Sequence, residues 1–336
     1  MGTVVSLGSI NVDLVSTLDS AALDDLATGR EWFPAAGATV RVETLPDEIE
    51  ALPHEVYLGG KGANQAVAAA RADADATLLG KVGRDEADFG VCDGLRESGV
   101  AVDEVGRSDD ETGKAAVFVD ETGENRIAIV EGANGGVDEG YVAAHEARIR
   151  AADCLLLQNE IPVSPALALL DRLHELDDGP TVVVDPAPVD GAAPLVRHPA
   201  VDVVRPNEYE YVALGDALAD FSGTVVQTRG AESVLVESDE TFTVSPPPTN
   251  PVDTTGAGDS FNGYLAAELA RGSSLRAAVE VATVAASLSI ESAGAQASIP
   301  TLEAVRAYAE TVGAFDSADA ADAADAANSA DSLDST

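Results

Sequence analysis

The chain alternates between short apolar runs and helical patterns through its second half, and this alternation limits the possible fold more than any other feature. A strand followed by a helix brings the next strand back parallel to the first, so repetition of the unit builds a doubly wound sheet. We therefore predict an α/β fold with a central, mostly parallel sheet flanked by helices. The predicted strands lie at 3–8, 154–158, 181–184, 201–204, 225–228 and 233–237.

Polar side chains follow several of these predicted strands. Asn11 and Asp13 follow the first strand, Glu160 follows the second, and Asp185 follows the third. In open parallel sheets, ligands bind at the carboxyl ends of the strands. Asn and Asp after one strand are ordinary turn residues. Their repetition along one edge of the sheet favours a ligand site there.

Residues 251–263 combine the turn Gly256-Ala257-Gly258 with Asp259, where an amphipathic helix is predicted to begin. Unpaired N–H groups and the helix dipole at such a start attract anions, and glycines let a phosphate oxygen approach the backbone. Asp259 could take the proton of a hydroxyl that attacks a phosphoryl group held there. Taken alone, the stretch is better explained as a loop before a helix whose first turn favours an acid.

A second glycine-rich turn precedes another predicted helix, at residues 59–66. Gly59 and Gly60 are followed by Lys61 and Asn64, and Lys61 is one of only three lysines in the chain. The glycines could serve only to pack the helix closely on the sheet. The scarcity of lysine argues against a merely solvent-exposed role for Lys61.

The stretch between residues 14 and 58 is too long for a simple connection. It contains short alternating pieces and a predicted helix at 20–27, and a predicted hairpin follows at 114–120 and 125–130. We expect a small β lid made of segments 14–58 and 107–132, added to a main domain within residues 1–313. Residues 314–336 are mostly Ala, Asp and Ser, which predicts a disordered acidic tail. Further elements expected are a strand at 77–83 and helices at 85–98, 275–289 and 301–312.

Charge excludes some classes of partner. The chain has 19 basic and 59 acidic residues, a net charge of −40 and a pI near 4.1. Binding to nucleic acid or to an anionic membrane needs clustered Lys and Arg, so neither is expected. The acids are scattered, which is typical of a folded protein from a salt-rich cytoplasm. An acidic interaction protein would carry its acids in blocks, and only the predicted tail does.

Cysteine content and the N-terminus indicate the compartment. Cys92 and Cys154 are too few for a disulfide framework and are expected to be reduced. The chain shows no secretory signal pattern and no apolar run of membrane-spanning length. We therefore expect a cytoplasmic protein.

Several motifs together resemble those of the ribokinase family of carbohydrate kinases. The resemblance runs from residue 4 to residue 300 and rests on the order and spacing of the motifs, since each one alone is weak. Within the family it is strongest to the members that phosphorylate ribose, and the acidic composition indicates a haloarchaeal type. The motifs lie at 8–13, 59–66, 132–134, 185–188, 206–210, 252–263 and 294–298.

The resemblance implies an ATP-dependent kinase that phosphorylates the 5-hydroxyl of ribose, with a β lid that also forms a homodimer contact. It implies that Asp259 is the catalytic base and that Gly256, Ala257 and Gly258 form an anion hole. The implied sugar-binding residues are Asn11, Asp13, Gly59, Gly60, Lys61, Asn64, Glu160 and Asp259.

The same resemblance implies a nucleotide site with Mg²⁺ and a nearby site for K⁺ as activator. Asn207 and Glu210 match the family's Asn-x-x-Glu pattern near the phosphates and Mg²⁺. The other implied nucleotide-binding residues are Thr228, Gly230, Gly258 and Thr283. The implied K⁺ positions, several of them through backbone carbonyls, are Asp253, Thr255, Ser289, Ser292, Gly294 and Ser298.

Three departures from the family pattern leave details open. Segment 14–58 is longer than usual, a second glycine is missing after Gly230, and Ala282-Thr283 replaces the Asn or His often found near adenine. Other functions therefore remain: a kinase for ribose-1-phosphate that yields ribose 1,5-bisphosphate, a kinase for another sugar or a nucleoside, and a non-catalytic sugar-binding regulator.

A sugar phosphate would need cationic donors in addition to the sugar-binding residues. Arg30, Arg41 and Arg126 in the lid segments could supply them. The simpler explanation is that these arginines pair with neighbouring acids such as Glu31, Glu43 and Glu124.

Overall fold

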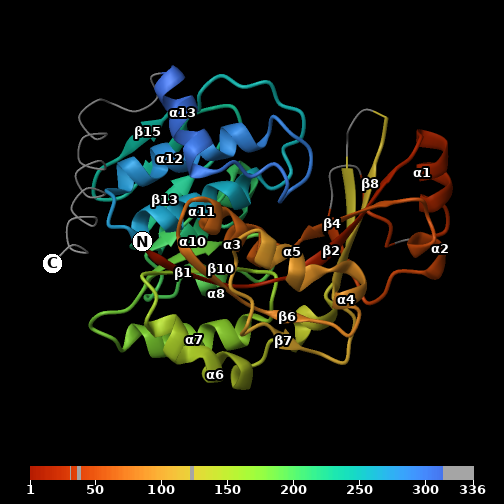
Figure 1. Cartoon of the computed structure of the whole chain (residues 1–336), viewed down its shortest axis with the longest axis horizontal. Coiled ribbons are helices and arrows are strands. Elements are labelled where there is room, and N and C mark those ends of the chain that lie inside the picture. Colours follow the sequence, from red (N-terminus) through yellow and green to blue (C-terminus); the bar gives the residue numbers. More distant parts are fainter. Residues whose placement is uncertain (31, 36–38, 122–124, 313–336) are drawn as a thin grey trace.

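The computed structural model describes residues 1–30, 32–35, 39–121 and 125–312. They form a large domain and a small sheet that projects from one side of it (Figure 1). The predicted acidic tail at 314–336 lies outside the described residues. Within them, no helix is long and apolar enough to cross a membrane.

The large domain is built on an eight-stranded sheet in the order β15-β14-β13-β12-β11-β10-β1-β5. The strands from β13 to β5 pair in parallel, and β14 and β15 pair antiparallel at the other edge. The parallel strands are covered on both faces, which explains their unbroken apolar sequences. The strands are β1 (Thr3–Leu7), β5 (Asp75–Leu79), β10 (Cys154–Gln158), β11 (Thr181–Asp185), β12 (Val203–Val204), β13 (Thr224–Gln227), β14 (Val234–Glu237) and β15 (Phe242–Val244).

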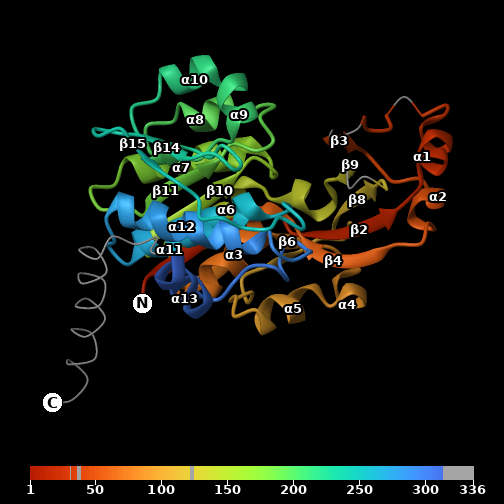
Figure 2. The same ribbon diagram turned by 90° about the horizontal axis from the view of Figure 1, so that it is seen from above.

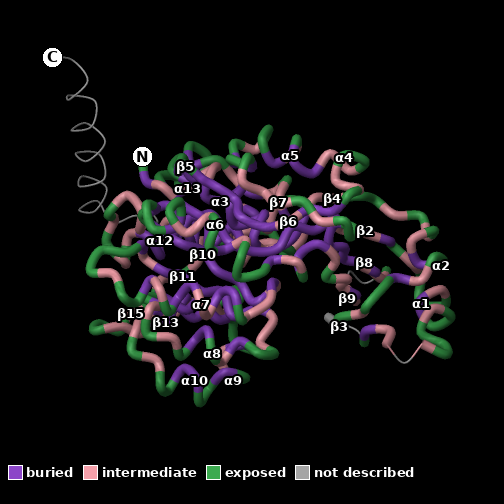
Figure 3. Tube along the Cα trace, turned by 90° about the horizontal axis from the view of Figure 1, so that it is seen from below, coloured by how far each residue is buried: buried purple, intermediate pink, exposed green. Residues whose placement is uncertain are grey.

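Helices cover both faces of this sheet (Figure 2). Successive residues of a strand point to opposite faces, so Val4 and Val5 of β1 belong to two separate apolar cores. Figure 3 shows buried residues concentrated along the sheet and the inner sides of the helices. The first core holds α3 (Lys61–Arg71), α5 (Val91–Glu97), α11 (Ala257–Ala270), α12 (Leu275–Ser289) and α13 (Leu302–Val312), and the second holds α6 (Glu139–Arg150), α7 (Val163–His174), α8 (Ala193–Val196) and α10 (Gly215–Ala219).

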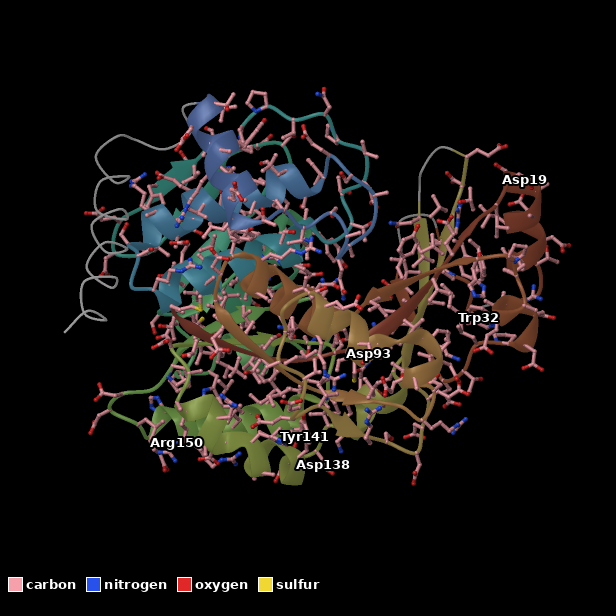
Figure 4. The ribbon with its side chains drawn as sticks, viewed as in Figure 1. Asp19, Trp32, Asp93, Asp138, Tyr141 and Arg150 are labelled. Atoms are coloured by element: carbon pink, nitrogen blue, oxygen red, sulfur yellow. The ribbon has the colours of Figure 1, made fainter. Side chains whose placement is uncertain are left out.

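The small sheet has five strands in the order β3-β9-β8-β2-β4. One of its faces is covered by α1 (Ser20–Ala27) and α2 (Asp47–Glu50), whose Leu23 and Ile49 belong to the same apolar core as Leu14 and Phe118 of the sheet. Trp32 lies in this part of the molecule, away from the large domain (Figure 4). The strands are β2 (Asn11–Thr17), β3 (Thr39–Val42), β4 (Glu55–Gly59), β8 (Gly113–Val119) and β9 (Asn125–Val130).

Glycines interrupt two elements that the sequence predicts as continuous. The strand predicted at 77–83 divides at Gly80 into β5 and β6 (Lys81–Val82), and β6 pairs with β7 (Gly106–Arg107). The helix predicted at 85–98 divides at Gly90, whose φ of +65° is left-handed, into α4 (Glu86–Phe89) and α5. A left-handed residue ends a helix because it turns the backbone away from the helical path.

Two other predictions are corrected by the structure. The alternative explanation of Asn11 and Asp13 as turn residues is wrong, because both lie in β2 of the small sheet. The sequence analysis also missed the short edge strand β15. Cys92 and Cys154 are buried and unbonded, as expected. The remaining elements are η1 (Gly132–Gly136) and α9 (Glu208–Ala213).

Candidate active site

The candidate site lies where the carboxyl ends of the parallel strands meet the N-termini of α3 and α11. Asp185 ends β11, Glu160 follows β10, and Asp259 lies in the first turn of α11. Gly263 lets α11 pack tightly on α3, because a Cβ there would overlap Ala68 and lie 2.6 Å from the Gln65 carbonyl oxygen. This close approach brings Asp259 next to the side chains of α3.

Asp259 is held at both of its carboxylate oxygens. Asn64 Nδ2 donates to Oδ2 at 2.9 Å, and Gln65 Nε2 donates to Oδ1 at 3.0 Å. The side chain is 5% exposed. A carboxylate with both oxygens fixed by neutral donors is oriented but has no cation bound directly to it. It can therefore accept a proton from one defined direction.

The turn before α11 has the shape that the sequence predicts. Gly256 caps the helix with a left-handed φ of +78°, and a Cβ there would lie 2.9 Å from Ala295 Cα. A Cβ at Gly258 would lie 2.9 Å from Arg205 Nη2. Gly256 therefore requires glycine for conformation and for close packing, and Gly258 requires it for close packing alone. This helix start is suited to a phosphoryl group, although Ala257 N already donates to the Thr254 carbonyl at 3.3 Å.

The residues predicted to bind the sugar include several charged groups. The carboxylate of Asp13 lies so close to Gly59 that a Cβ there would overlap it. Glu160 accepts hydrogen bonds from the Ser9 hydroxyl and, at 3.1 Å, from the backbone N–H of Lys61. Carboxylates and an ammonium group gathered in one place are suited to the several hydroxyl groups of a small sugar.

Burial and the charges of neighbouring side chains shift the pKa values of Asp13, Glu160 and Lys61. Burial, with the charges of Glu160 and Asp259, raises the pKa of Asp13 to about 7. Burial also raises the pKa of Glu160, although Lys61 and Ser9 oppose the shift. Burial disfavours charge on Lys61, but Asp259, Asp185 and Glu160 outweigh it and hold the pKa of Lys61 above its ordinary value. Lys61 is therefore a cation at neutral pH.

Asn134 has a part in the site that the sequence analysis did not assign. Its Oδ1 accepts from the N–H of Ile10 at 2.9 Å, and its Nδ2 donates to Asn11 Oδ1 at 2.8 Å. Both bonds orient Asn11 at the point where the chain enters the small sheet. The motif 132–134 pointed to this residue, but its partner lies more than a hundred positions away in the chain.

On the phosphate side, Asn207 and Glu210 form a capping box at the start of α9. Glu210 N donates to Asn207 Oδ1 at 2.9 Å, and Asn207 N donates to Glu210 Oε2 at 2.8 Å. Burial raises the pKa of Glu210, although Arg205 opposes the shift. Thr228 N donates to the Pro206 carbonyl at 3.0 Å, so β13 ends beside this motif.

The other residues predicted to bind the nucleotide include Gly230 and Thr283, which lie in a turn and in a helix. Gly230 follows β13 in a left-handed turn with φ of +54°. Thr283 is buried within α12, where its hydroxyl donates to the Val279 carbonyl at 2.7 Å. Its hydroxyl proton is therefore already engaged inside the helix.

Asp253 joins the two loops predicted to hold K⁺. Its carboxylate accepts from Thr255 N at 2.9 Å and from Gly294 N at 3.0 Å, and these bonds outweigh burial and hold the pKa of Asp253 low. Ser298 Oγ is buried without a hydrogen-bond partner among the described residues. Ser289 Oγ donates to the Ala286 carbonyl, while Ser292 is exposed.

Metal-binding side chains are sparse in this region. Across the part of the chain that the structure describes, no group of three or more His, Cys, Asp or Glu could hold a metal ion. A divalent ion would need ligands from a bound nucleotide.

The three lid arginines that the sequence analysis singled out are paired with acids. Arg30 contacts Glu48, Arg126 lies 3.5 Å from Asp120, and Arg41 lies 3.9 Å from Glu131. Arg41 also donates to the Asn159 carbonyl at 3.0 Å, beside Glu160. Two of the expected partners, Glu31 and Glu124, lie outside the described residues.

Sequence comparison decides the family. Residues 1–302 match the sequence profile of the pfkB family carbohydrate kinases. The chain belongs to the pfkB family. This assignment confirms the predicted family, the α/β fold class and the prediction of an ATP-dependent carbohydrate kinase.

Individual pfkB-family proteins resemble the chain over most of its length. The ribokinase of Schizosaccharomyces pombe is 34% identical over 330 residues, which covers 90% of this chain and 96% of that protein. The bifunctional ribokinase/ribose-5-phosphate isomerase A of Fructilactobacillus sanfranciscensis is 34% identical over 323 residues, and the chain spans 56% of its length and 91% of its own. The structure of Arabidopsis thaliana ribokinase complexed with ribose and ATP has a TM-score of 0.74, with 26% identity over 91% of this chain and 98% of that one.

Proposed function

We propose that this pfkB-family kinase uses ATP to phosphorylate the 5-hydroxyl of ribose. The observation that carries the proposal is Asp259, buried beside the anion-binding turn with Asn64 and Gln65 on its two oxygens. The similarity to ribokinases from several organisms supports ribose as the sugar.

The reaction follows from this geometry. Asp259 takes the proton of the sugar hydroxyl as the sugar oxygen bonds to the γ-phosphorus. The bond from the γ-phosphorus to the bridging oxygen breaks, and ADP leaves with the electron pair. The N–H groups of the turn at Gly256, Ala257 and Gly258 stabilise charge on the phosphoryl oxygens. Lys61 adds positive charge beside the sugar, and Asn11, Asp13, Gly60 and Glu160 orient its hydroxyls.

Two ions fit this site in different ways. Mg²⁺ prefers oxygen ligands and keeps several waters, so it needs few carboxylates from the protein. The buried carboxylate of Glu210 would suit a Mg²⁺ ion that arrives bound to the ATP phosphates and neutralises their charge. Thr228, Gly230 and Thr283 would lie along the nucleotide.

For K⁺, the unpartnered hydroxyl of Ser298 and the Asp253 link between the two loops support a site. Replacing K⁺ by Na⁺ at constant ionic strength should lower the rate without changing circular dichroism. Equal rates would contradict a specific K⁺ site.

The small sheet would act as the lid of the site and as a contact between two copies of the chain. Its outer face is already covered by α1 and α2. A lid dimer would therefore use the edge strand β4, where Val56 is 45% exposed, and the half-buried Val15 and Val117 of the inner face. Light scattering should report twice the monomer mass. The high acidic charge supports a cytoplasm rich in salt as the setting.

Ribose-1-phosphate is a second candidate substrate, and Arg41 is the observation that favours it. In β-sheet register, Arg41 pairs with Ile129, Ile129 with Ala115, and Ala115 with Asp13. Residues paired across strands share a face of the sheet. The guanidinium therefore lies on the face that carries Asp13, where it could bind a phosphate on the sugar.

The deciding test is a kinase assay with purified protein, ATP and a panel of ribose, ribose-1-phosphate, hexoses and nucleosides. Ribose should give the highest kcat/KM. A preference for ribose-1-phosphate of about tenfold or more, about 1.4 kcal/mol in transition-state binding, would replace ribose as the substrate. Sugar binding without turnover in any combination would indicate a regulator instead of an enzyme.

A further inference from the structure

A buried ion pair lies directly behind the proposed catalytic base. Arg205 is 4% exposed and Asp185 is fully buried, and Arg205 Nη2 donates to Asp185 Oδ2 at 2.7 Å. No role was assigned to either charge in the reaction above. A buried pair of this kind contributes little net stability, because the loss of hydration offsets the attraction between the charges. Its presence beside the base therefore calls for another explanation.

Asp185 connects this ion pair to Asp259 through one side chain, Gln65. Gln65 Nε2 donates to Asp185 Oδ2 and to Asp259 Oδ1, each at 3.0 Å, so both of its amide hydrogens are used. Gln65 Oε1 accepts from Gln158 Nε2 at 2.7 Å. Rotation of the Gln65 amide would break all of these bonds. Asp185 and Gln158 therefore fix the orientation of Gln65, which in turn holds one of the two carboxylate oxygens of Asp259.

Arg205 also supports the helix that carries the base. Its Nε donates to Asn262 Oδ1 at 3.0 Å, and Asn262 Nδ2 donates to Asp185 Oδ2 at 2.9 Å. Asn262 lies one turn after Gly258 in α11. The guanidinium also packs against Gly258, where a Cβ would lie 2.9 Å from Nη2. A permanent cation thus lies behind the turn that would hold the phosphoryl group.

We propose that Arg205 is a positioning residue for phosphoryl transfer, which orients Asp259 through Asp185 and Gln65 and places positive charge behind Gly258. The neighbouring charges of Asp185, Glu210 and Asp259 outweigh burial and hold the pKa of Arg205 above its ordinary value, so it keeps this charge throughout the reaction. Charge fixed in a buried site stabilises a transition state more than the same charge does in water. The inference rests on the proposed kinase function.

The test separates this role from simple structural support. Arg205→Met alone would leave Asp185 buried and uncompensated, so the informative variant is Arg205→Met combined with Asp185→Asn, which removes both charges. Arg205→Lys keeps the positive charge but loses the planar guanidinium group that donates to both Asp185 and Asn262. Gln65→Leu cuts the connection to Asp259 and leaves the ion pair intact. Arg197→Met with Asp220→Asn is the control, because this pair is exposed at 3.1 Å on the other face of the sheet.

We expect the Arg205/Asp185 double variant to lower kcat by about thirtyfold or more while KM for ribose changes less than about threefold. Gln65→Leu should lower kcat by about tenfold. The kcat of Arg205→Lys should be closer to that of the wild type than the kcat of the double variant is. The control pair should keep the wild-type kcat. Near-ultraviolet circular dichroism and thermal unfolding report the fold of every variant.

A wild-type kcat in the double variant would overturn the proposal. If the double variant does not fold, Gln65→Leu and Arg205→Lys decide: a normal kcat in Gln65→Leu, or a rise in KM without a fall in kcat in both, would also overturn it. Failure of the proposed function looks different, because the wild-type protein would then phosphorylate no sugar at all.

Discussion

The turn of α11 and the small sheet face the same site, but they are built in opposite ways. At Asp259, both carboxylate oxygens have partners on another helix, and a Cβ at Gly263 would leave no room between α11 and α3. On the inner face of the small sheet, Val15 and Val117 are half-buried, and Arg41 bonds to a backbone carbonyl of the large domain, that of Asn159. The contrast indicates that the start of α11 carries out phosphoryl transfer, whereas the small sheet adapts to the substrate that binds. Substitutions in each region should therefore affect different kinetic constants.

The largest effect is expected from Asp259→Asn. Loss of the proton acceptor should lower kcat by at least about a hundredfold with little change in the affinity for ribose. Steady-state kinetics and ribose titration calorimetry check this. Asp202→Asn is a suitable control, because Asp202 binds the N–H of Val182 at the opposite end of the strands. Near-normal kcat in a folded Asp259→Asn protein would remove the base from the mechanism.

A pair of glycine variants tests how tightly the turn is packed. Gly256→Ala and Gly272→Ala both place a Cβ at a left-handed residue, with φ of +78° and +83°. Only Gly256 would collide with a neighbour, Ala295, since nothing lies within 4 Å of a Cβ at Gly272. Gly272→Ala should cost about 1–2 kcal/mol of stability and leave kcat unchanged. Gly256→Ala should cost more and lower kcat by about tenfold. Urea unfolding and kinetics distinguish them, and equal behaviour of the two variants would contradict the packing argument.

Asp13 in the small sheet gives a prediction about pH. Its pKa of about 7 in the folded protein exceeds the ordinary value of 3.8, so protonation favours folding and this contribution is lost as pH rises through 7. Asp13→Asn stays neutral at every pH. Its stability relative to the wild type should therefore rise by on the order of 3 kcal/mol between about pH 4 and pH 8. Urea unfolding at both pH values measures this, and a constant difference would show that Asp13 ionises normally.

The smallest effect on ribose is expected from Arg41→Ala. Its side chain is 51% exposed, so loss of its bonds should change kcat/KM for ribose by less than about threefold. If ribose-1-phosphate is accepted, its KM should rise by about tenfold. Arg30→Ala is the matched control, because Arg30 contacts Glu48 in the same part of the molecule. Equal effects of Arg41→Ala on the two sugars would argue against a phosphate contact.

Local patterns in the sequence carried much of the fold and of the site. The helix predicted at 275–289 is observed as Leu275–Ser289, because its ends are marked by a capping Ser274 and by the end of its apolar pattern. Asp259 and the glycine turn were found because they are contiguous. The break at Gly90 could not be predicted, since a glycine does not reveal in sequence whether its φ is positive. The break at Gly80 could not be predicted either, because it depends on the pairing of β6 with the distant β7.

The bonds between distant residues could not be predicted in the same way. Gln65 and Asp185 are 120 positions apart, and their contact exists only because α3, α11 and the end of β11 converge. Arg205 directly precedes the motif at 206–210, and an arginine after a buried strand in so acidic a chain was an available signal. Its meaning depended on Asp185, which the sequence presented only as one more polar residue at the edge of the sheet.

The chain crosses between the two sheets at four places, and glycine lies at each of them, at Gly8, Gly60, Gly113 and Gly132. Gly60 and Gly132 have φ of +88° and +50°, and a Cβ at Gly113 would overlap both Asn11 and Asn134. Together these crossings would define a hinge line, because the five strands beyond them are joined in one continuous sheet. Asn11 and Gly60 lie on that line, where rotation displaces them least. Arg41 is in register with Asp13, close to the line, so it would move little more than Asp13 does. The largest displacement would fall at the far ends of the strands, at Thr17 and Asn125, while the proposed sugar-binding residues keep their geometry.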